Sequence, residues 1–331
     1  MSTEFDLPDT VRDAFGVRGL TVTALPQDAS TRSYGRVTHP EFGACLVLSD
    51  MPEASHFRNY LTIAPHLRGM GLSAPRIYAT DSALGFALIE DFGLTTYARE
   101  LAGGADEGSL YDLATDVLIR LHGRPEATGI ALPPYDMDLL LTEASRFTEW
   151  CLPALGHTLG ADDLAEHEAL WRDALAEVAG RRDVMVMRDF HIDNLMLLAG
   201  REGPARCGLL DFQDGLIGAA AYDLVSLTQD ARRDVPRGIE ARVLERYLAA
   251  RPETDRATLM ADFWRLGAQR HAKVAGLFHR LNRRDGKPGY LKHVPRVLRL
   301  LERALLKGGL TGIAEFYDRS APGWRKHAAR G

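Results

Sequence analysis

The sequence predicts an α+β protein of two lobes, a small lobe with a mostly antiparallel sheet and a larger, mostly helical lobe. The chain has 331 residues, which is long for one small core and suits two packed lobes. Short β-type runs separated by turn-rich segments continue up to Ile89. From Leu94 onward, apolar residues recur at the three- and four-residue intervals of one-faced helices. We therefore expect one lobe over residues 1–92 and another over 93–331.

The composition is that of an ordinary folded protein, with 46% hydrophobic and 26% charged residues. A net charge of -5 gives no broad basic surface, so nucleic acid is not expected as a partner. The three cysteines lack CxxC spacing, which argues against a zinc site or a disulfide framework and suits a reducing cytosol. No basic start followed by an apolar run is present, and no stretch has the length of a membrane span. We expect a cytoplasmic protein without membrane contact.

The predicted first lobe combines a small sheet with one helix. Apolar residues between Glu53 and Met70 recur at helical spacing, and Gly71 is expected to end that helix. The charged and glycine-containing segment Glu90–Gly93 marks the expected crossover between the lobes. Five β-type runs are expected to form the sheet, at residues 20–25, 34–38, 45–49, 76–79 and 85–89.

The predicted second lobe is helical except between residues 184 and 214, where two β-like runs, 184–187 and 207–210, flank polar clusters. Residues 324–331 are expected to form a loosely held basic tail. Helices are expected at residues 109–122, 138–155, 162–179, 221–231 and 256–281.

The polar residues between positions 184 and 214 are of the kinds that phosphoryl transfer requires. Asp189 and Asn194 lie five residues apart between apolar runs, and Asp211 follows the next apolar run. Transfer requires a carboxylate near the attacking hydroxyl and oxygen ligands for Mg²⁺, which neutralises the phosphates. Asp189 is therefore the candidate base or hydroxyl-positioning group, and Asn194 and Asp211 are candidate metal ligands.

Each of these residues also has a simpler explanation. A single aspartate in a loop often caps a helix, and an asparagine after a turn commonly bonds its own backbone. The joint pattern of apolar run, Asp189, Asn194, apolar run and Asp211 is much rarer by chance than any one of its members. We therefore interpret the three residues as one catalytic constellation.

At these residues the chain resembles the kinase-like phosphotransferases of the aminoglycoside-phosphotransferase and choline-kinase superfamily. The similarity covers nearly the whole chain and is greatest to the branch that contains the anomeric N-acetylmuramate/N-acetylglucosamine kinases of bacterial cell-wall recycling. The segments that resemble this branch are residues 28–36, 210–214, 222–227, 269–274, 284–288, 290–291 and 294–296.

The resemblance implies a protein-kinase-like fold with Mg²⁺ and ATP between the lobes and the sugar acceptor on the helical lobe. It makes Asp189 the catalytic aspartate and makes Asn194 and Asp211 the metal ligands. The loop 28–35 would cover the phosphates through backbone N–H groups and the hydroxyls of Ser30 and Thr31. A simple hairpin is the alternative for a polar loop that precedes a strand.

Two further acidic residues gain expected roles. Glu90, at the crossover, is assigned to the nucleotide site. Asp223 matches a family aspartate that braces the catalytic loop, although a helix-start cap is an alternative for it.

The sequence departs from the family pattern at two places. Met187 stands where the family usually has a histidine two residues before the catalytic aspartate, and His191 is an alternative source of that support. The strand lysine that clamps phosphates in protein kinases is also missing, and no helix glutamate pairs with that position.

Three arginines are candidates for the missing positive charge. We expect Arg36, or failing that Arg32, to supply it, because a guanidinium can bind phosphate oxygens. Solvated surface arginines are the alternative. Arg188, beside Asp189, is counted with the catalytic residues, where it steadies either the phosphates or the loop.

Residues for the acceptor are less specific. The polar positions Arg270, His271, Lys273 and Asp285 suit an acceptor pocket, but a charged helix face exposed to water explains them as well. One predicted helix carries a second set, Glu143, Phe147, Glu149 and Trp150. An aromatic residue there could stack on a sugar ring, but core packing is the expected role of Phe147.

By the resemblance, the acceptor is the C1 hydroxyl of N-acetylmuramate or N-acetylglucosamine. An aminoglycoside, choline or another small alcohol is an alternative, since the fold does not fix the substrate. A catalytically inactive kinase-like binding protein is the alternative from another class, motivated by Met187 and the missing lysine.

Overall fold

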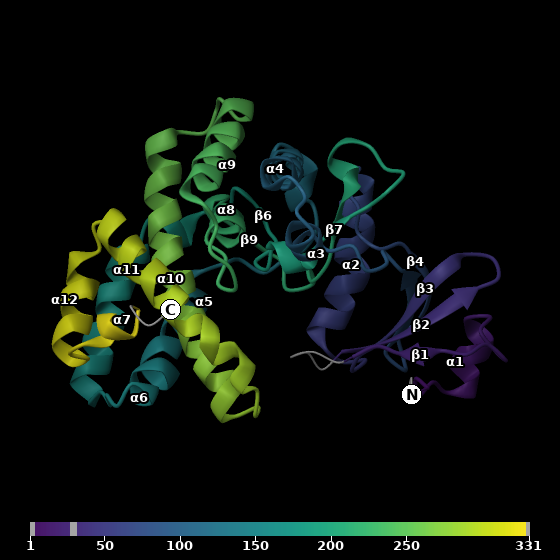
Figure 1. Ribbon diagram of the computed structural model, residues 1–331, viewed down its shortest axis with the longest axis horizontal. Helices are drawn as coiled ribbons and strands as arrows, with labels where there is room; N and C mark the ends of the chain where they lie inside the picture. Colours follow the sequence, from purple (N-terminus) through teal and green to yellow (C-terminus); the bar gives the residue numbers. More distant parts are fainter. Residues whose placement is uncertain (1–3, 27–31, 329–331) are drawn as a thin grey trace. The chain divides into compact units, whose positions relative to one another are not determined.

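A computed structural model of the protein describes residues 4–26 and 32–328 (Figure 1). Its contacts divide the chain into a first unit, Met1–Ala131 with Ile192–Gly215, and a second unit, Leu132–His191 with Leu216–Gly331. Residues 192–215 thus pack with the N-terminal sheet although they are far from it in the sequence. The expected boundary after Phe92 divides a nucleotide-binding lobe from an acceptor-binding lobe. That division of binding roles stays a prediction.

The first unit contains the antiparallel sheet that the sequence predicts. Its five strands lie in the order β1-β2-β3-β5-β4, and each strand is antiparallel to its neighbours. The strands are β1 (Thr23–Ala24), β2 (Ser33–His39), β3 (Gly43–Ser49), β4 (Ile77–Asp81) and β5 (Phe86–Glu90).

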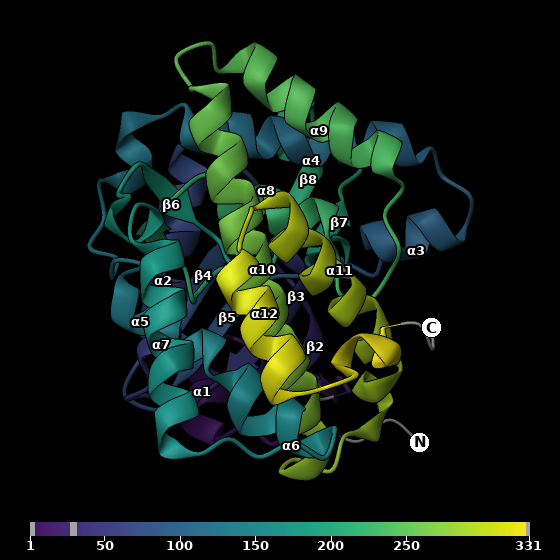
Figure 2. The same cartoon turned by 90° about the vertical axis from the view of Figure 1, so that its left-hand side faces the viewer.

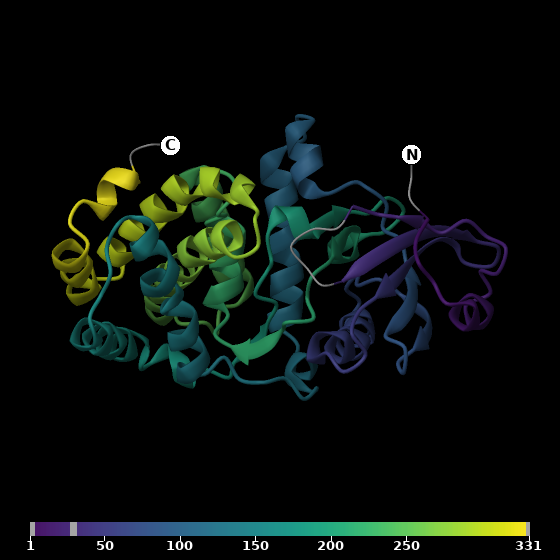
Figure 3. The same cartoon turned by 90° about the horizontal axis from the view of Figure 1, so that it is seen from below.

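One face of this sheet is covered by the N-terminal segment, which includes α1 (Asp9–Ala14) (Figure 3, purple). Val11 of α1 belongs to a buried cluster with Val47 of β3 and Leu88 of β5. Leu48 and Ala87 alternate with these strand residues and are also buried, which places them on the opposite face. Burial of both faces makes this sheet a fixed support for the segments that follow it.

The helices of the first unit begin with α2 (Ser55–Gly69), which packs beside β4 and buries its periodic apolar face. Two more helices, α3 (Tyr97–Ala102) and α4 (Glu107–His122), contact a hairpin of β7 (Leu195–Leu197) and β8 (Cys207–Leu209). The short 3₁₀ segments are η1 (Pro125–Thr128), η4 (Ile192–Asn194) and η5 (Gly203–Arg206).

Two main-chain hydrogen bonds attach the hairpin to the rest of the first unit. The Leu209 N–H donates to the Ser73 carbonyl (2.7 Å), and the Leu197 N–H donates to the Thr95 carbonyl (2.8 Å). The hairpin carries the predicted metal ligands at its end, so these bonds fix their position within this unit.

The second unit is mostly helical and contains one two-stranded sheet. β6 (Val184–Val186) pairs with β9 (Leu216–Gly218), so the predicted β-like runs 184–187 and 207–210 belong to different sheets. The helices are α5 (Met137–Ala144), α6 (Leu152–Ala154), α7 (Ala161–Leu175), α8 (Ala221–Thr228), α9 (Arg237–Ala250), α10 (Arg256–Arg283), α11 (Val294–Lys307) and α12 (Thr311–Ser320). A π-helical turn, η2 (Phe147–Cys151), separates α5 from α6, and 3₁₀ segments lie at η3 (Val178–Gly180), η6 (Pro288–His293) and η7 (Trp324–His327).

The long helix α10 is the main packing element of the second unit. It begins at a cap in which the Asp255 carboxylate accepts the Thr258 N–H (2.8 Å). It runs alongside α11, which contacts α12 (Figure 2), and it also contacts α5 and α8.

Within residues 4–26 and 32–328, every helix falls short of the length and apolarity that a bilayer-spanning helix needs.

The prediction of a loosely held tail is wrong for residues 324–328. Trp324 is completely buried against Phe147 and Tyr317, and its indole N–H donates to Asp318 (2.9 Å). Arg325 forms ion pairs with Asp318 and Glu302. The basic residues around Trp324 suggested an exposed tail, whereas contacts with distant aromatic residues bury the tryptophan. Residues 329–331 lie outside the described part of the chain.

We predict that Gly276→Ala destabilises the protein. A Cβ at Gly276 would lie 2.0 Å from the carbonyl oxygen of Arg146, so α10 has to move away from that segment. Overpacking of this kind costs about 1–3 kcal/mol, which chemical unfolding would measure. The matched control is Gly238→Ala on α9, where no atom lies within 4 Å of the added Cβ. It should leave stability unchanged or raise it, and equal losses in both variants would contradict the packing argument.

Candidate active site

The hairpin brings the two predicted metal ligands together in the first unit. Leu195 pairs with Leu209, and the Leu210 N–H donates to the Asn194 carbonyl (3.0 Å). Asn194 and Asp211 therefore lie at the same end of the hairpin, with the Asn194 amide nitrogen 3.5 Å from Asp211 Oδ2. Two oxygen-bearing side chains at this separation are suited to one Mg²⁺ ion.

Asp211 has an unusual backbone conformation that its neighbours maintain. Its φ angle is +58°, and among the described residues only Arg188 is another non-glycine residue with positive φ. The adjacent Phe212 is buried and stacks on Tyr60 of α2, with ring centroids 5.1 Å apart. The Asn59 amide of α2 donates to the Gln213 carbonyl (3.0 Å). Helix α2 thus holds the strained segment in place.

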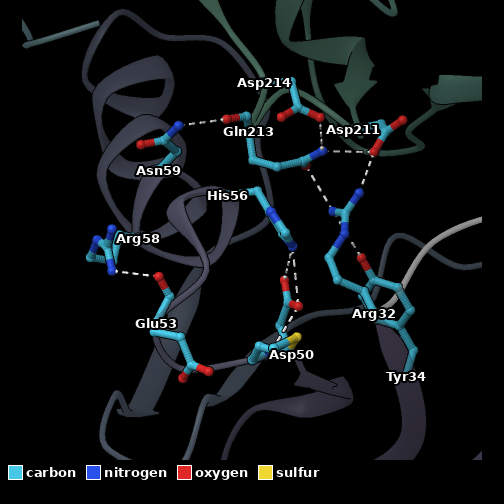
Figure 4. Close-up of polar contacts among 11 residues, drawn as sticks. Arg32, Tyr34, Asp50, Glu53, His56, Arg58, Asn59, Asp211, Gln213 and Asp214 are labelled. Carbon is cyan, nitrogen blue, oxygen red and sulfur yellow. Dashed lines mark hydrogen bonds and ion pairs between the residues drawn. The ribbon is translucent and has the colours of Figure 1, made fainter.

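Arg32 lies at the predicted metal ligand (Figure 4). Its Nη2 donates to Asp211 Oδ1 (2.5 Å), and its Nη1 donates to Gln213 Oε1 (2.8 Å). The Gln213 amide also donates to Asp211 Oδ1 (2.9 Å). Arg36 instead forms an ion pair with Asp91, with Nε 2.5 Å from Oδ2. Of Arg32 and Arg36, Arg32 is therefore the one beside Asp211.

The remaining predicted nucleotide residues have mixed outcomes. Ser30 and Thr31 lie outside the described residues, so their assignment stays a prediction. The Glu90 carboxylate forms ion pairs with Arg68 and Arg201. These contacts show a structural role for the Glu90 side chain, and its assignment to the nucleotide site also stays a prediction.

An acid and a histidine connect the end of β3 with α2, in the region where the sequence lacks the kinase lysine and glutamate. The Asp50 carboxylate accepts the Met51 N–H (2.8 Å) and lies 3.1 Å from His56 Nε2 of α2 (Figure 4). Sequence reasoning missed this pair, because an aspartate and a histidine six residues apart carry no recognised motif.

The second unit holds the loop with Asp189. Arg188 precedes it at φ +69°. The Asp223 carboxylate on α8 accepts the main-chain N–H groups of Met187 (2.7 Å) and Arg188 (2.9 Å). The Ser226 hydroxyl donates to the Arg188 carbonyl (3.1 Å). These bonds confirm that Asp223 braces the loop instead of capping its own helix.

The environment of Asp223 explains how the loop tolerates Met187 in place of a histidine. Asp223 is completely buried, and burial raises its pKa to about 7, although the two main-chain N–H groups act in the opposite direction. The Met187 side chain is buried too. The loop is thus supported by hydrogen bonds to its main chain. The side chain at position 187 makes none of these bonds, so a residue that packs well is sufficient there.

A buried carboxylate holds the side chain of Arg188. Glu143 of α5 accepts hydrogen bonds from Arg188, from the Tyr135 hydroxyl, from Lys273 Nζ (2.8 Å) and from the Gln269 amide (3.3 Å). Burial alone would raise the pKa of Glu143, but Lys273 and Arg188 outweigh it and lower that pKa to about 2. Glu143 is therefore an anion that fixes two cations beside the loop.

The positions considered for an acceptor pocket are not an exposed helix face. Arg270, His271 and Lys273 are all buried on α10, so the water-exposed alternative is wrong for them. Arg270 donates to the Ser226 hydroxyl (3.0 Å), which in turn supports the loop with Asp189. Asp285 pairs with its neighbour Arg284 at the surface.

Burial also indicates the roles of two residues in the predicted helix 138–155. Phe147 is a core residue, as predicted. The role of Glu143 was missed, since the only signal for it is a carboxylate on an otherwise apolar helix face.

Comparisons with known proteins show what the whole chain is similar to. The sequence profile of the family described as "Phosphotransferase enzyme family" matches residues 21–261. An N-acetylmuramate/N-acetylglucosamine kinase of Caulobacter vibrioides is 39% identical over 270 residues, which are 80% of this chain and 74% of that protein. A protein of the same name from Neisseria meningitidis is 32% identical over 321 residues, 92% of this chain and 91% of the relative.

Solved structures with low sequence identity share the fold. A choline/ethanolamine kinase family protein from Mesorhizobium loti has a TM-score of 0.62 at 14% identity, covering 93% of this chain and 98% of its own. The ADP-bound aminoglycoside phosphotransferase APH(2″)-Ib has a TM-score of 0.58 at 15% identity, with 89% and 97% covered. The predicted kinase-like α+β fold is thereby confirmed. Because the profile spans more than half of the sequence and the relatives match most of it, the chain belongs to the phosphotransferase enzyme family.

Proposed function

We propose that this enzyme transfers the γ-phosphoryl group of ATP to the anomeric hydroxyl of N-acetylmuramate and N-acetylglucosamine. The names of the relatives support this acceptor. The observation that carries the proposal is that the two described non-glycine residues with positive φ, Arg188 and Asp211, are the neighbour of the predicted base and a predicted metal ligand. Backbone strain of this kind persists where the surrounding structure holds it, typically at functional sites. Since ATP is the donor, we place the enzyme in the cytoplasm.

Asn194 and Asp211 fit a magnesium ion. Asp211 offers carboxylate oxygens, and the Asn194 amide presents its oxygen after a half-turn about its terminal bond, an orientation that depends on the hydrogen-bond partner. Held by these two side chains, Mg²⁺ would neutralise negative charge on the phosphates.

Asp189 would orient the acceptor hydroxyl and accept its proton late in the transfer. The Asp223 carboxylate accepts the main-chain N–H groups of Met187 and Arg188, and the Ser226 hydroxyl donates to the Arg188 carbonyl. These bonds restrict the positions that Asp189 can take. A fixed carboxylate lowers the entropy cost of aligning the hydroxyl with the phosphorus.

Arg32 would supply the charge of the missing lysine. Its guanidinium has donors that match phosphate oxygens in a bidentate arrangement. It already lies 2.5 Å from Asp211, so a short side-chain movement would transfer it from that carboxylate to the phosphates. Arg36 is held at Asp91, which supports Arg32 over Arg36 for this role.

The first test is transfer of labelled phosphate from ATP, with Mg²⁺, to N-acetylmuramate, N-acetylglucosamine, choline and kanamycin. We expect 1-phosphate formation on the two amino sugars. Asp189→Asn should lower kcat by at least about a hundredfold, because the amide cannot accept the proton.

Asp193→Asn is the matched control, an exposed aspartate in the same loop, and it should retain activity within about threefold. Transfer to choline or kanamycin alone would contradict the proposed acceptor. ATP binding without transfer to any acceptor would favour an inactive binding protein.

A second test separates the two arginines. Arg32→Ala should lower kcat/KM for ATP by about a hundredfold, as expected when a charge-assisted phosphate contact is lost. Arg36→Ala should change kcat/KM for ATP by less than about threefold and act on stability, because it removes an ion pair with a buried carboxylate. Steady-state kinetics and chemical unfolding of both variants provide the comparison. The reverse pattern would return the role to Arg36.

A further inference from the structure

Two cations in the second unit share one carboxylate oxygen. Arg188 Nη2 and Lys273 Nζ both contact Oε1 of Glu143, the latter at 2.8 Å. Within the described ranges, neither cation forms an ion pair with any other carboxylate. Asp189 also acts on Arg188, but its effect on the pKa of Arg188 is smaller than that of Glu143. Among the direct contacts, one negative charge therefore faces two positive charges.

Burial makes this excess charge costly. The Glu143 side chain is 0% exposed, whereas 17% of the Arg188 side chain and 10% of the Lys273 side chain are exposed. A largely buried cation without a full counter-charge is unfavourable unless another anion completes the site. The carboxylate lies inside and the cations retain access to solvent, as a site for an external anion requires.

The cations have unused hydrogen-bond donors. Lys273 Nζ donates to Glu143 and to the Tyr222 hydroxyl (3.3 Å), which leaves one of its three donors. In the described part of the chain, the buried Nε of Arg188 has no hydrogen-bond partner. A planar acceptor group with two oxygens would satisfy such donors.

The cluster lies next to the proposed base. Arg188 directly precedes Asp189 in the chain. Tyr222, which binds Lys273, directly precedes Asp223, whose carboxylate holds the main chain of Arg188. The Tyr135 and Tyr222 rings contact each other edge to face, with centroids 5.0 Å apart, and form an apolar wall at the cations.

We propose that Arg188 and Lys273 form a subsite that binds a carboxylate on the acceptor sugar. This inference rests on the proposed function and specifies which part of the acceptor the second unit recognises. N-acetylmuramate differs from N-acetylglucosamine by a lactyl ether with a carboxylate, so the subsite favours the former. If Lys273 were only a counter-ion of Glu143, its loss would affect both sugars equally.

The test compares the two sugars in Lys273→Met, which keeps the apolar stem and removes the charge. We expect kcat/KM for N-acetylmuramate to fall about 10- to 100-fold, the usual effect of losing a hydrogen bond to a charged group. The value for N-acetylglucosamine should stay within about threefold. Glu143 keeps Arg188, Tyr135 and Gln269 as donors in this variant. The ratio of the two values does not depend on the folded fraction.

Arg303→Met is the matched control, since Arg303 pairs with the buried Glu240 in the same unit; it should leave the ratio unchanged. A second measurement uses the wild type alone: the methyl ester of N-acetylmuramate should lose at least the factor that Lys273→Met loses, because the ester removes the charge that both cations would bind. An unchanged ratio in Lys273→Met, or full activity with the ester, would overturn the subsite while the kinase proposal stands. No transfer by the wild type to either sugar would overturn both.

Discussion

Two adjacent main-chain N–H groups donate hydrogen bonds to one buried carboxylate, and these bonds determine the shape of the loop before Asp189. Asp223 accepts from Met187 and Arg188, which holds Arg188 at a positive φ angle. Without such bonds, a residue with a side chain would leave this conformation, which costs of order 1–3 kcal/mol. The orientation of Asp189, the attachment of Arg188 to Glu143 and the proposed acceptor subsite all depend on this constraint.

In the first unit, packing against a helix maintains a second strained residue. Asp211 also has positive φ. Helix α2 holds it because Tyr60 stacks on Phe212 and the Asn59 amide donates to the Gln213 carbonyl. Each unit thus contributes one strained residue that a neighbouring helix stabilises. Backbone strain that neighbouring elements maintain in this way is typical of functional sites, where side chains are positioned before the reaction begins.

The sequence predicted the chemistry better than the packing. The spacing of Asp189, Asn194 and Asp211 was sufficient to identify candidates, because the residue types follow from the reaction. The apolar run expected after Asn194 is the strand β7, although its three residues are too few for a periodic signal. The role of Glu143 and the burial of Trp324 were missed for a common reason: both depend on contacts with distant elements, which no local pattern encodes.

The kinetics of Asp223→Asn test most directly whether the Asp223 carboxylate holds the loop in its reactive shape. The amide offers only one oxygen to the two N–H groups and directs its own donor at one of them, so the loop should lose its conformation. We predict that kcat falls about a hundredfold or more while KM for ATP changes less than about threefold. Asp262→Asn, at another buried carboxylate of the second unit paired with Arg181, should keep its kcat. A kcat of Asp223→Asn within about threefold of the wild type would contradict the account.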